Sequence, residues 1–176
     1  MNICIFASAN PVGPEYALPA FELGKALGSA GCSLVFGGYA DGLMKAAADG
    51  FAAAGADITG VVTDFFDSEK DHYPHLTKTI TCLSLSERKD RMTRLSDAFI
   101  VLPGGIGTLD EAFSVLCAKS CNQAKGAVLF YNTLGFWDEA LKMLQDMRRR
   151  GFIRSDMDGA YTVCQTPEDA LRALGL

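Results

Sequence analysis

Residues 102–111 carry the strongest chemical signal in the sequence. Three glycines, Gly104, Gly105 and Gly107, stand within four positions. A strand-like apolar run comes before them and apolar residues at helical spacing follow, so we expect a strand, a glycine-rich turn and a helix. Glycines leave the main chain open to a ligand, and a helix N-terminus presents unpaired N–H groups with a partial positive charge. The segment therefore favours binding of a phosphate group.

The same residues also allow a purely structural interpretation. Thr108 and Glu111 fit a capping box, in which Thr108 caps the helix and the Glu111 side chain returns to the Thr108 N–H. Ligand binding is favoured because the glycines exceed what a simple turn requires. The spacing matches neither G-x-G-x-x-G nor G-x-x-x-x-G-K-[ST], so it indicates neither the dinucleotide fingerprint nor the Walker motif.

A second glycine-rich turn, at residues 37–44, also lies between a strand-like run and a helix. Parallel strands end at the same edge of a sheet, so both turns are expected to line one pocket. Met44 either packs in the core or contacts a base, and Asp41 is a candidate helix cap. Ser8, in the loop after the first strand, is a candidate donor to phosphate or ribose, the alternative being a solvated loop residue.

A helix is predicted to carry residues 87–95, with Ser84 or Ser86 as its cap. It includes two cations, Arg88 and Lys89, with no acidic residue four positions before them. The helix dipole disfavours positive charge near a helix N-terminus. These cations are therefore expected to meet a phosphate or a carboxylate such as Glu111, unless they face solvent. Arg88 would then orient Glu111 and lower its pKa, which keeps the carboxyl group ionised.

These features combine into one chemical hypothesis. With a 5′-phosphate on residues 104–108, Glu111 would lie one helical turn away, within reach of the attached ribose. A carboxylate there can stabilise the positive charge that develops as the bond from C1′ to the base breaks, or it can position a water. The hypothesis is hydrolysis of the N-glycosidic bond of a nucleotide.

Apolar runs alternate with helical patterns along the chain, which predicts a single α/β domain over residues 1–176. The expected fold is Rossmann-like, with a mostly parallel sheet and helices on both faces. Residues 64–78 fit neither pattern, and an irregular loop of this length suggests a lid or a partner-binding element. Strands are expected at residues 3–7, 32–36, 57–62, 78–83, 97–102, 127–131 and 160–164.

Composition limits the classes of partner. The net charge of −5 gives no general attraction for a nucleic-acid polymer. The sequence has no apolar run of about eighteen residues and no basic-then-apolar leader, so we expect a soluble, cytoplasmic protein without a membrane span. The six cysteines form no C-x-x-C pair, which indicates reduced, mostly buried thiols. His72 and His75 lack a set of acidic or cysteine neighbours, so no metal site is predicted.

The pattern Pro103-Gly104-Gly105-x-Gly107-Thr108-x-x-Glu111, together with Gly37-Gly38, Gly42-Leu43-Met44 and Arg88-Lys89, resembles the LOG (Lonely Guy) family of cytokinin riboside 5′-monophosphate phosphoribohydrolases. The resemblance covers residues 3–153. It implies a homodimer that releases a free base and ribose 5-phosphate from a nucleoside 5′-monophosphate, without a metal or redox cofactor. It also implies that Arg88 and Glu111 are catalytic, that Gly104, Gly105, Gly107 and Thr108 hold the phosphate, and that Met44 and Lys89 lie near the base or ribose.

Four departures from the family pattern bear on the substrate. Tyr39 replaces a glycine, Lys45 replaces the glycine after Leu-Met, Ser86 replaces a histidine, and residues 7–9 replace Cys-Gly-Ser. Tyr39 and Lys45 would narrow or recharge the pocket, so a general nucleoside monophosphate is as good a candidate as a prenylated adenine nucleotide.

Two other functions compete with hydrolysis. The first is a non-catalytic nucleotide or cofactor carrier, resembling the molybdenum-cofactor carriers that share the fold and the glycine-rich motif. A carrier needs the glycines but not the pair Arg88 and Glu111. The second, lysine decarboxylation, has little support because the sequence shows no pyridoxal-binding lysine context.

Overall fold

A seven-stranded sheet forms the centre of the chain in the computed structural model, which describes residues 1–63, 72–154, 157 and 159–176. All neighbouring strands in this sheet are parallel, so the prediction of a mostly parallel sheet is confirmed. The strands are β1 Asn2–Phe6, β2 Ser33–Phe36, β3 Ile58–Thr63, β4 Lys78–Cys82, β5 Ala98–Val101, β6 Val128–Tyr131 and β7 Thr162–Cys164.

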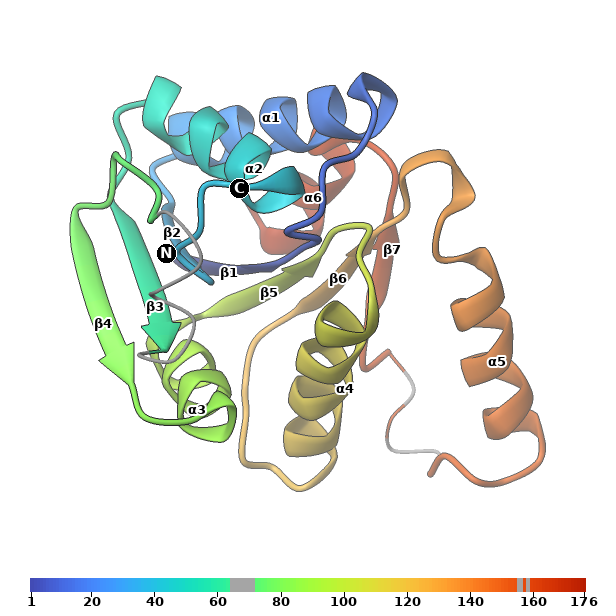
Figure 1. The fold of residues 1–176 in the computed structure, drawn as a ribbon. Coiled ribbons are helices and arrows are strands. Elements are labelled where there is room, and N and C mark those ends of the chain that lie inside the picture. Colours follow the sequence, from blue (N-terminus) through green and yellow to red (C-terminus); the bar gives the residue numbers. More distant parts are fainter. Residues whose placement is uncertain (64–71, 155–156, 158) are drawn as a thin grey trace.

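Helices cover both faces of the sheet, as the sequence predicted (Figure 1). One face carries α1 Pro14–Ser29, α2 Gly42–Ala53 and α6 Pro167–Leu174. The other face carries α3 Leu85–Leu95, α4 Ile106–Ser120 and α5 Asp138–Arg149, with the short 3-10 helix η1 Thr133–Gly135 before α5.

The central strand β1 shows why short apolar runs become strands here. Its side chains alternate between the two faces, so Ile3 and Ile5 join one hydrophobic cluster while Cys4 and Phe6 join the other. Each of these four residues is at most 2% exposed. A parallel strand covered by helices on both faces needs apolar side chains at every position, which a continuous apolar run supplies.

The strand order β4-β3-β2-β1-β5-β6-β7 creates a switch point beside β1. The chain runs from β1 outward to β4 on one side, then returns to β5 and runs outward to β7 on the other side. The loops that follow β1 and β5 therefore diverge at the carboxyl edge of the sheet, where open α/β sheets bind ligands. This is the edge at which both glycine-rich turns lie.

The helix caps and the cysteines follow the sequence-based predictions in part. Asp41 occupies the N-cap position of α2, as expected, but its side chain makes no capping hydrogen bond. Ser84 does cap α3, since its hydroxyl accepts a hydrogen bond from the Glu87 N–H at 3.1 Å. All six cysteines are free, and four of them are buried as expected. In the predicted lid segment, residues 64–71 lie outside the described residues.

Across residues 1–63, 72–154, 157 and 159–176, no helix combines the length and apolar character needed to span a bilayer.

Candidate active site

The turn after β5 leads directly into α4 and leaves the start of that helix without a side-chain cap. Gly105 is the N-cap residue, with extended backbone (φ −93°, ψ −153°). The first N–H groups of a helix have no partner inside the helix, so those of Ile106, Gly107 and Thr108 are available to a ligand. A methyl group on Gly105 or Gly107 would meet no atom within 4 Å, apart from the turn itself. This open, N–H-rich site suits an anion.

The capping-box interpretation of Thr108 and Glu111 is wrong. The helix begins at Ile106, so Thr108 lies inside the first turn and not at the N-cap. Its side chain packs against Gly104, where a Cβ would collide with the Thr108 Oγ1. The Glu111 carboxylate contacts Arg88 and not the α4 backbone. A guanidinium is a stronger partner for a buried carboxylate than a backbone N–H, which accounts for the difference.

Arg88 from α3 and Glu111 from α4 meet in the interior. Nη1 of Arg88 lies 3.2 Å from Oε1 of Glu111, and Nε of Arg88 donates to the Val61 carbonyl at 2.8 Å. Arg88 is 9% exposed and Glu111 is 6% exposed. Val61 lies near the end of β3, so the ion pair sits at the carboxyl edge of the sheet. The expected pairing of Arg88 with Glu111 is therefore present.

Burial raises the pKa of Glu111 to about 7, because loss of water around the carboxylate outweighs the attraction of Arg88. Asp110 raises this pKa further, and Lys89 lowers it. The sequence-based expectation that Arg88 would keep the pKa low is thus wrong in its net direction, although Arg88 does act in the expected sense. A carboxyl group that titrates near neutral pH can exchange a proton with water or substrate.

The turn after β2 brings Gly37 against the guanidinium. A Cβ on Gly37 would collide with Nη2 of Arg88 and would lie 3.1 Å from Sδ of Met44. The absence of a side chain at this position therefore lets Arg88 lie against the main chain, with Met44 next to it. This places the predicted Met44 beside the buried ion pair.

The loop after β1 ties the two turns together through Ser8. The Ser8 N–H donates to the Pro103 carbonyl at 3.1 Å, and the Ser8 carbonyl accepts from the N–H groups of Leu43 at 2.9 Å and Met44 at 3.2 Å. The Ser8 hydroxyl accepts from the Asn10 N–H at 3.0 Å and still has its own proton to donate. Ser8 thus fixes the spacing between the two glycine-rich turns.

Lys89 lies outside the buried pair. Its Nζ is 2.8 Å from each carboxylate oxygen of Asp110 and 3.1 Å from Oγ of Ser114. These bonds connect α3 to α4 along a groove that Ser86 also borders. The family resemblance implies a position near the base or ribose, whereas the structure binds Lys89 to Asp110.

The two departures expected to change the pocket have partners of their own. Tyr39 is 4% exposed, pairs with His72 in an antiparallel bridge, and has its ring 6.0 Å from the His72 ring. Nζ of Lys45 pairs with Asp49 at 2.5 Å, and Asp49 also accepts from the Tyr73 hydroxyl at 2.9 Å. The positive charge of Lys45 is therefore balanced by the Asp49 carboxylate in the same helix.

A cavity of about 290 Å³ opens at the switch point between β1 and β5. Tyr16 and Phe136 form one side of it, with their rings edge to face at 6.1 Å. These two aromatic residues could not be predicted from the sequence as part of the site, because only the strand order brings α1 and η1 next to Gly104. The lining residues are Ser8, Asn10, Val12, Tyr16, Pro103, Gly104, Gly105 and Phe136.

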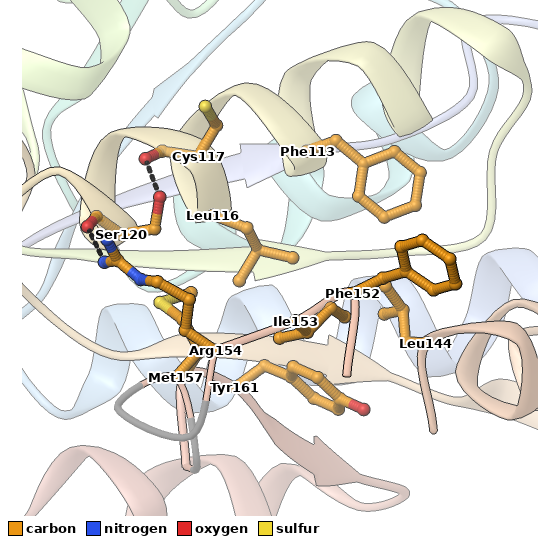
Figure 2. A pocket seen from close by; sticks show the side chains of 11 residues that line it. Phe113, Leu116, Cys117, Ser120, Leu144, Phe152, Ile153, Arg154, Met157 and Tyr161 are labelled. Atoms are coloured by element: carbon orange, nitrogen blue, oxygen red, sulfur yellow. Dashed lines mark hydrogen bonds between the residues drawn. The ribbon is translucent and has the colours of Figure 1, made fainter. Parts of the chain in front are cut away.

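A larger cavity, of about 370 Å³, lies on the face that carries α4 and α5. Figure 2 shows that Phe113, Leu116 and Tyr161 line it, while Arg154 donates to the carbonyl of Ser120. None of its described lining residues is acidic. The switch-point cavity also has no acidic residue in its described lining, but Gly104 and Gly105 of the glycine-rich turn line it, whereas no glycine is among the described lining residues of the larger cavity.

The described residues offer little to a metal ion. No group of three or more His, Cys, Asp or Glu side chains among them is arranged to hold one. The candidate site comprises the main-chain N–H groups at the start of α4 and the pair Arg88 and Glu111.

Comparison with known proteins places these features in context. Residues 44–174 match a family model described as "Possible lysine decarboxylase". A cytokinin riboside 5′-monophosphate phosphoribohydrolase from Rhodococcoides fascians is 29% identical, covering 98% of this chain and 88% of that protein. The protein of the same name from Mycobacterium tuberculosis is 30% identical, covering 98% of this chain and 92% of its own length.

Solved structures agree on the architecture. The Moco carrier protein from Chlamydomonas reinhardtii superposes with a TM-score of 0.75 at 23% identity, covering 99% of this chain and 94% of that chain. This likeness supports the α/β, Rossmann-like fold.

Proposed function

This chain belongs to the LOG family, and from that premise we propose that it hydrolyses the N-glycosidic bond of a nucleoside 5′-monophosphate. The products would be the free base and ribose 5-phosphate. The names of the relatives from Rhodococcoides fascians and Mycobacterium tuberculosis support this reaction. The substrate class is a nucleotide of the AMP or cytokinin riboside monophosphate type, and the second would give the protein a role in cytokinin biosynthesis.

The buried contact between Arg88 and Glu111 is the observation that carries the proposal. The Glu111 carboxylate would take a proton from a water molecule whose oxygen forms a bond to C1′ of the ribose. At the same time the bond from C1′ to the base nitrogen breaks, its electron pair leaves with the base, and the base takes up a proton. Arg88 would hold the carboxylate in place, and the carboxylate would stabilise the developing positive charge on the sugar.

The phosphate would be held at the start of α4. The N–H groups of Gly107 and Thr108 and the open space at Gly105 support this assignment. Gly104 would let Thr108 pack closely beneath the phosphate. Ser8 would add a hydroxyl donor, while Met44 lies beside Arg88, in a position to contact the base or ribose.

Incubation with a panel of nucleotides tests the proposal. The panel contains AMP, other nucleoside monophosphates and isopentenyladenosine monophosphate, and free base is detected by chromatography. We expect base release by the parent protein, no release by Glu111→Ala with nucleotide still bound, and release lowered about 100-fold or more by Arg88→Ala. The matched control is Glu139→Ala, which removes an exposed carboxylate on α5 and should leave the rate unchanged.

A non-catalytic carrier is the second candidate, since a solved Moco carrier protein shares the fold. A carrier would need the glycine-rich turns but would have no use for a carboxyl group that titrates near neutral pH beside an arginine. Tight nucleotide binding without base release across the panel would favour the carrier. Base release by Glu111→Ala at the parent rate would remove Glu111 from the mechanism.

Assembly and location complete the proposal. The enzyme would act as a homodimer in the cytoplasm, with a small-molecule nucleotide as substrate and with no cofactor and no nucleic-acid polymer as partner. Sedimentation velocity should then give twice the 18.8 kDa mass of the chain. A species of 18.8 kDa at micromolar concentration would contradict the dimer.

A further inference from the structure

A second ion pair runs beside the pair of Arg88 and Glu111. Lys89 follows Arg88 in α3, and Asp110 precedes Glu111 in α4. Nζ of Lys89 lies 2.8 Å from both oxygens of Asp110 and 3.1 Å from Oγ of Ser114. Two consecutive residues of one helix therefore bind two consecutive residues of the other.

We propose that Lys89, Asp110 and Ser114 form a clamp between α3 and α4 that positions Glu111 against Arg88. In this view Lys89 is a positioning residue and not a ligand of the substrate. The proposal rests on the proposed function, because it assigns the clamp a part in the same hydrolysis.

The geometry supports this role because few described hydrogen bonds fix the inner pair, Arg88 and Glu111. In the contacts that the structure describes, one bond of 3.2 Å joins the Glu111 carboxylate to Arg88. Arg88 itself is anchored to β3 through the Val61 carbonyl. The position of Glu111 therefore depends on where α4 lies relative to α3. Lys89 makes three bonds across that same gap, one residue away from the inner pair.

Small displacements matter at such a site. Catalytic groups need to be held within about 0.5 Å of their productive geometry, and a misplacement of about 1 Å can cost about 100-fold in rate. Most of the Lys89 side chain is shielded, with 23% of it exposed. The Asp110 side chain is 54% exposed, so water screens this ion pair in part, and the third bond, from Lys89 to the half-buried Ser114, adds to what the pair supplies.

Charge gives the clamp a second effect on Glu111. The charged and titratable groups that act on this carboxyl group are Arg88, Lys89 and Asp110, and the buried thiol of Cys4 lies close enough to sense it. Lys89 lowers the pKa of Glu111 and Asp110 raises it. Removing Lys89 alone would leave the Asp110 charge unopposed.

Steady-state kinetics with the nucleotide that the parent protein hydrolyses tests the clamp. We expect Lys89→Met and Asp110→Asn each to lower kcat about 10-fold while KM stays within about 2-fold, which is the result of lost positioning and not of lost binding. The double variant should be no slower than the slower single variant, because both changes remove one bridge. Lys89→Arg keeps charge and reach, and should recover most of the rate.

The matched control is Lys142→Met, which removes an exposed lysine paired with Glu139 on α5 and should leave kcat unchanged. If Lys89→Met raises KM while Asp110→Asn has no effect, Lys89 binds the substrate and the clamp is refuted. An unchanged kcat in both single variants refutes it equally.

A second measurement separates this inference from the proposed function. NMR titration of Glu111 in protein with 13C-labelled glutamate requires no turnover. We expect the Glu111 pKa to rise in Lys89→Met, to fall in Asp110→Asn and to stay constant in Lys142→Met. If the parent protein hydrolyses no nucleotide, the proposed function fails while this titration still tests the clamp. An unchanged Glu111 titration in both clamp variants overturns the clamp.

Discussion

Two opposing effects set the pKa of Glu111. Burial disfavours its charged form, while the guanidinium of Arg88 favours that form, and the pKa of the carboxyl group comes out at about 7. Both protonation states are therefore accessible under ordinary conditions. A group of this kind is typical of sites that move protons, since its pKa lies near the working pH.

The first prediction concerns how activity depends on pH. Because the pKa of Glu111 is raised to about 7, the carboxyl group is mostly protonated below that pH and cannot accept a proton from water. We expect kcat to rise with pH through about 7 and to level off above it. A kcat that falls as the pH rises through 7 would instead assign Glu111 the role of an acid. Rates measured from pH 5 to pH 9 distinguish the two.

The second prediction concerns the glycine beneath Arg88. In Gly37→Ala the new methyl group would occupy the place of Nη2 of Arg88, and Met44 Sδ would be 3.1 Å from it. The guanidinium would have to shift, which would displace the contact of its Nη1 with Glu111, so we expect kcat to fall about 10-fold or more. Thermal unfolding of the variant serves as the control for folding. Full activity in a folded Gly37→Ala protein would show that the contact with Arg88 has no catalytic role.

Part of this site could be predicted from the sequence, and particular residues show where prediction ends. Arg88 stands out because it has no acidic residue four positions away in its own helix. Glu111 stands out because it follows Gly107 by four residues, about one helical turn. The partner of Lys89 is Asp110, which is 21 residues away along the chain. Pairing rules within one helix cannot find such a partner, because it depends on how α3 and α4 pack.

At the scale of elements, α4 shows a local motif losing to a tertiary contact. Thr108 and Glu111 have the spacing of a capping box, yet Glu111 binds Arg88. At α6 the same kind of motif does form, between Thr166 and Asp169. The described partners of Asp169 are local to that helix, so nothing draws its carboxylate away. The capping box of α6 thus persists beside the contact of Asp169 with Arg172 in the same helix, whereas the contact with Arg88 from another helix holds Glu111 away from the α4 backbone.

The third prediction concerns the start of α4. A glycine inside a helix lowers stability by about 0.5–1 kcal/mol relative to alanine, and Gly107 has open space where a methyl group would go. We therefore expect Gly107→Ala to raise the free energy of unfolding by about that amount. The same methyl group would intrude on the phosphate, so nucleotide affinity should fall about 10-fold.

Chemical denaturation and isothermal titration calorimetry on Gly107→Ala measure the two effects. The combination of higher stability and weaker binding identifies a glycine kept for the ligand and not for the fold. Unchanged affinity would argue against a phosphate at this helix, and lower stability would mean that the space is not open.

At the scale of the whole molecule, strand order assembles the site. Ser8, Gly37 and Gly104 follow β1, β2 and β5, which are neighbours in the sheet. The general behaviour of parallel strands was enough to predict that these turns share an edge. It was not enough to predict the cavity wall, because Tyr16 and Phe136 reach Gly104 only through the adjacency of α1 and η1.

The fourth prediction follows from burying Glu111 in the core of the folded molecule. Its folded-state pKa of about 7 lies above the value of about 4.3 expected in the unfolded chain, so the folded state binds more protons in between. This contribution to stability is fully present below the unfolded pKa and is lost as the pH rises through about 7. Between pH 5 and pH 8 the loss should be about 2–3 kcal/mol.

Urea unfolding of the parent protein and of Glu111→Gln at pH 5 and pH 8 isolates this contribution. The glutamine cannot ionise but can still accept a hydrogen bond from Arg88, so its stability should lack the part of the pH dependence that belongs to Glu111. The absolute stability of the variant is less informative, because it leaves the buried Arg88 charge without a counter-charge. The difference between the two pH dependences is the decisive quantity, and equal dependences would mean that burial does not raise the pKa of Glu111.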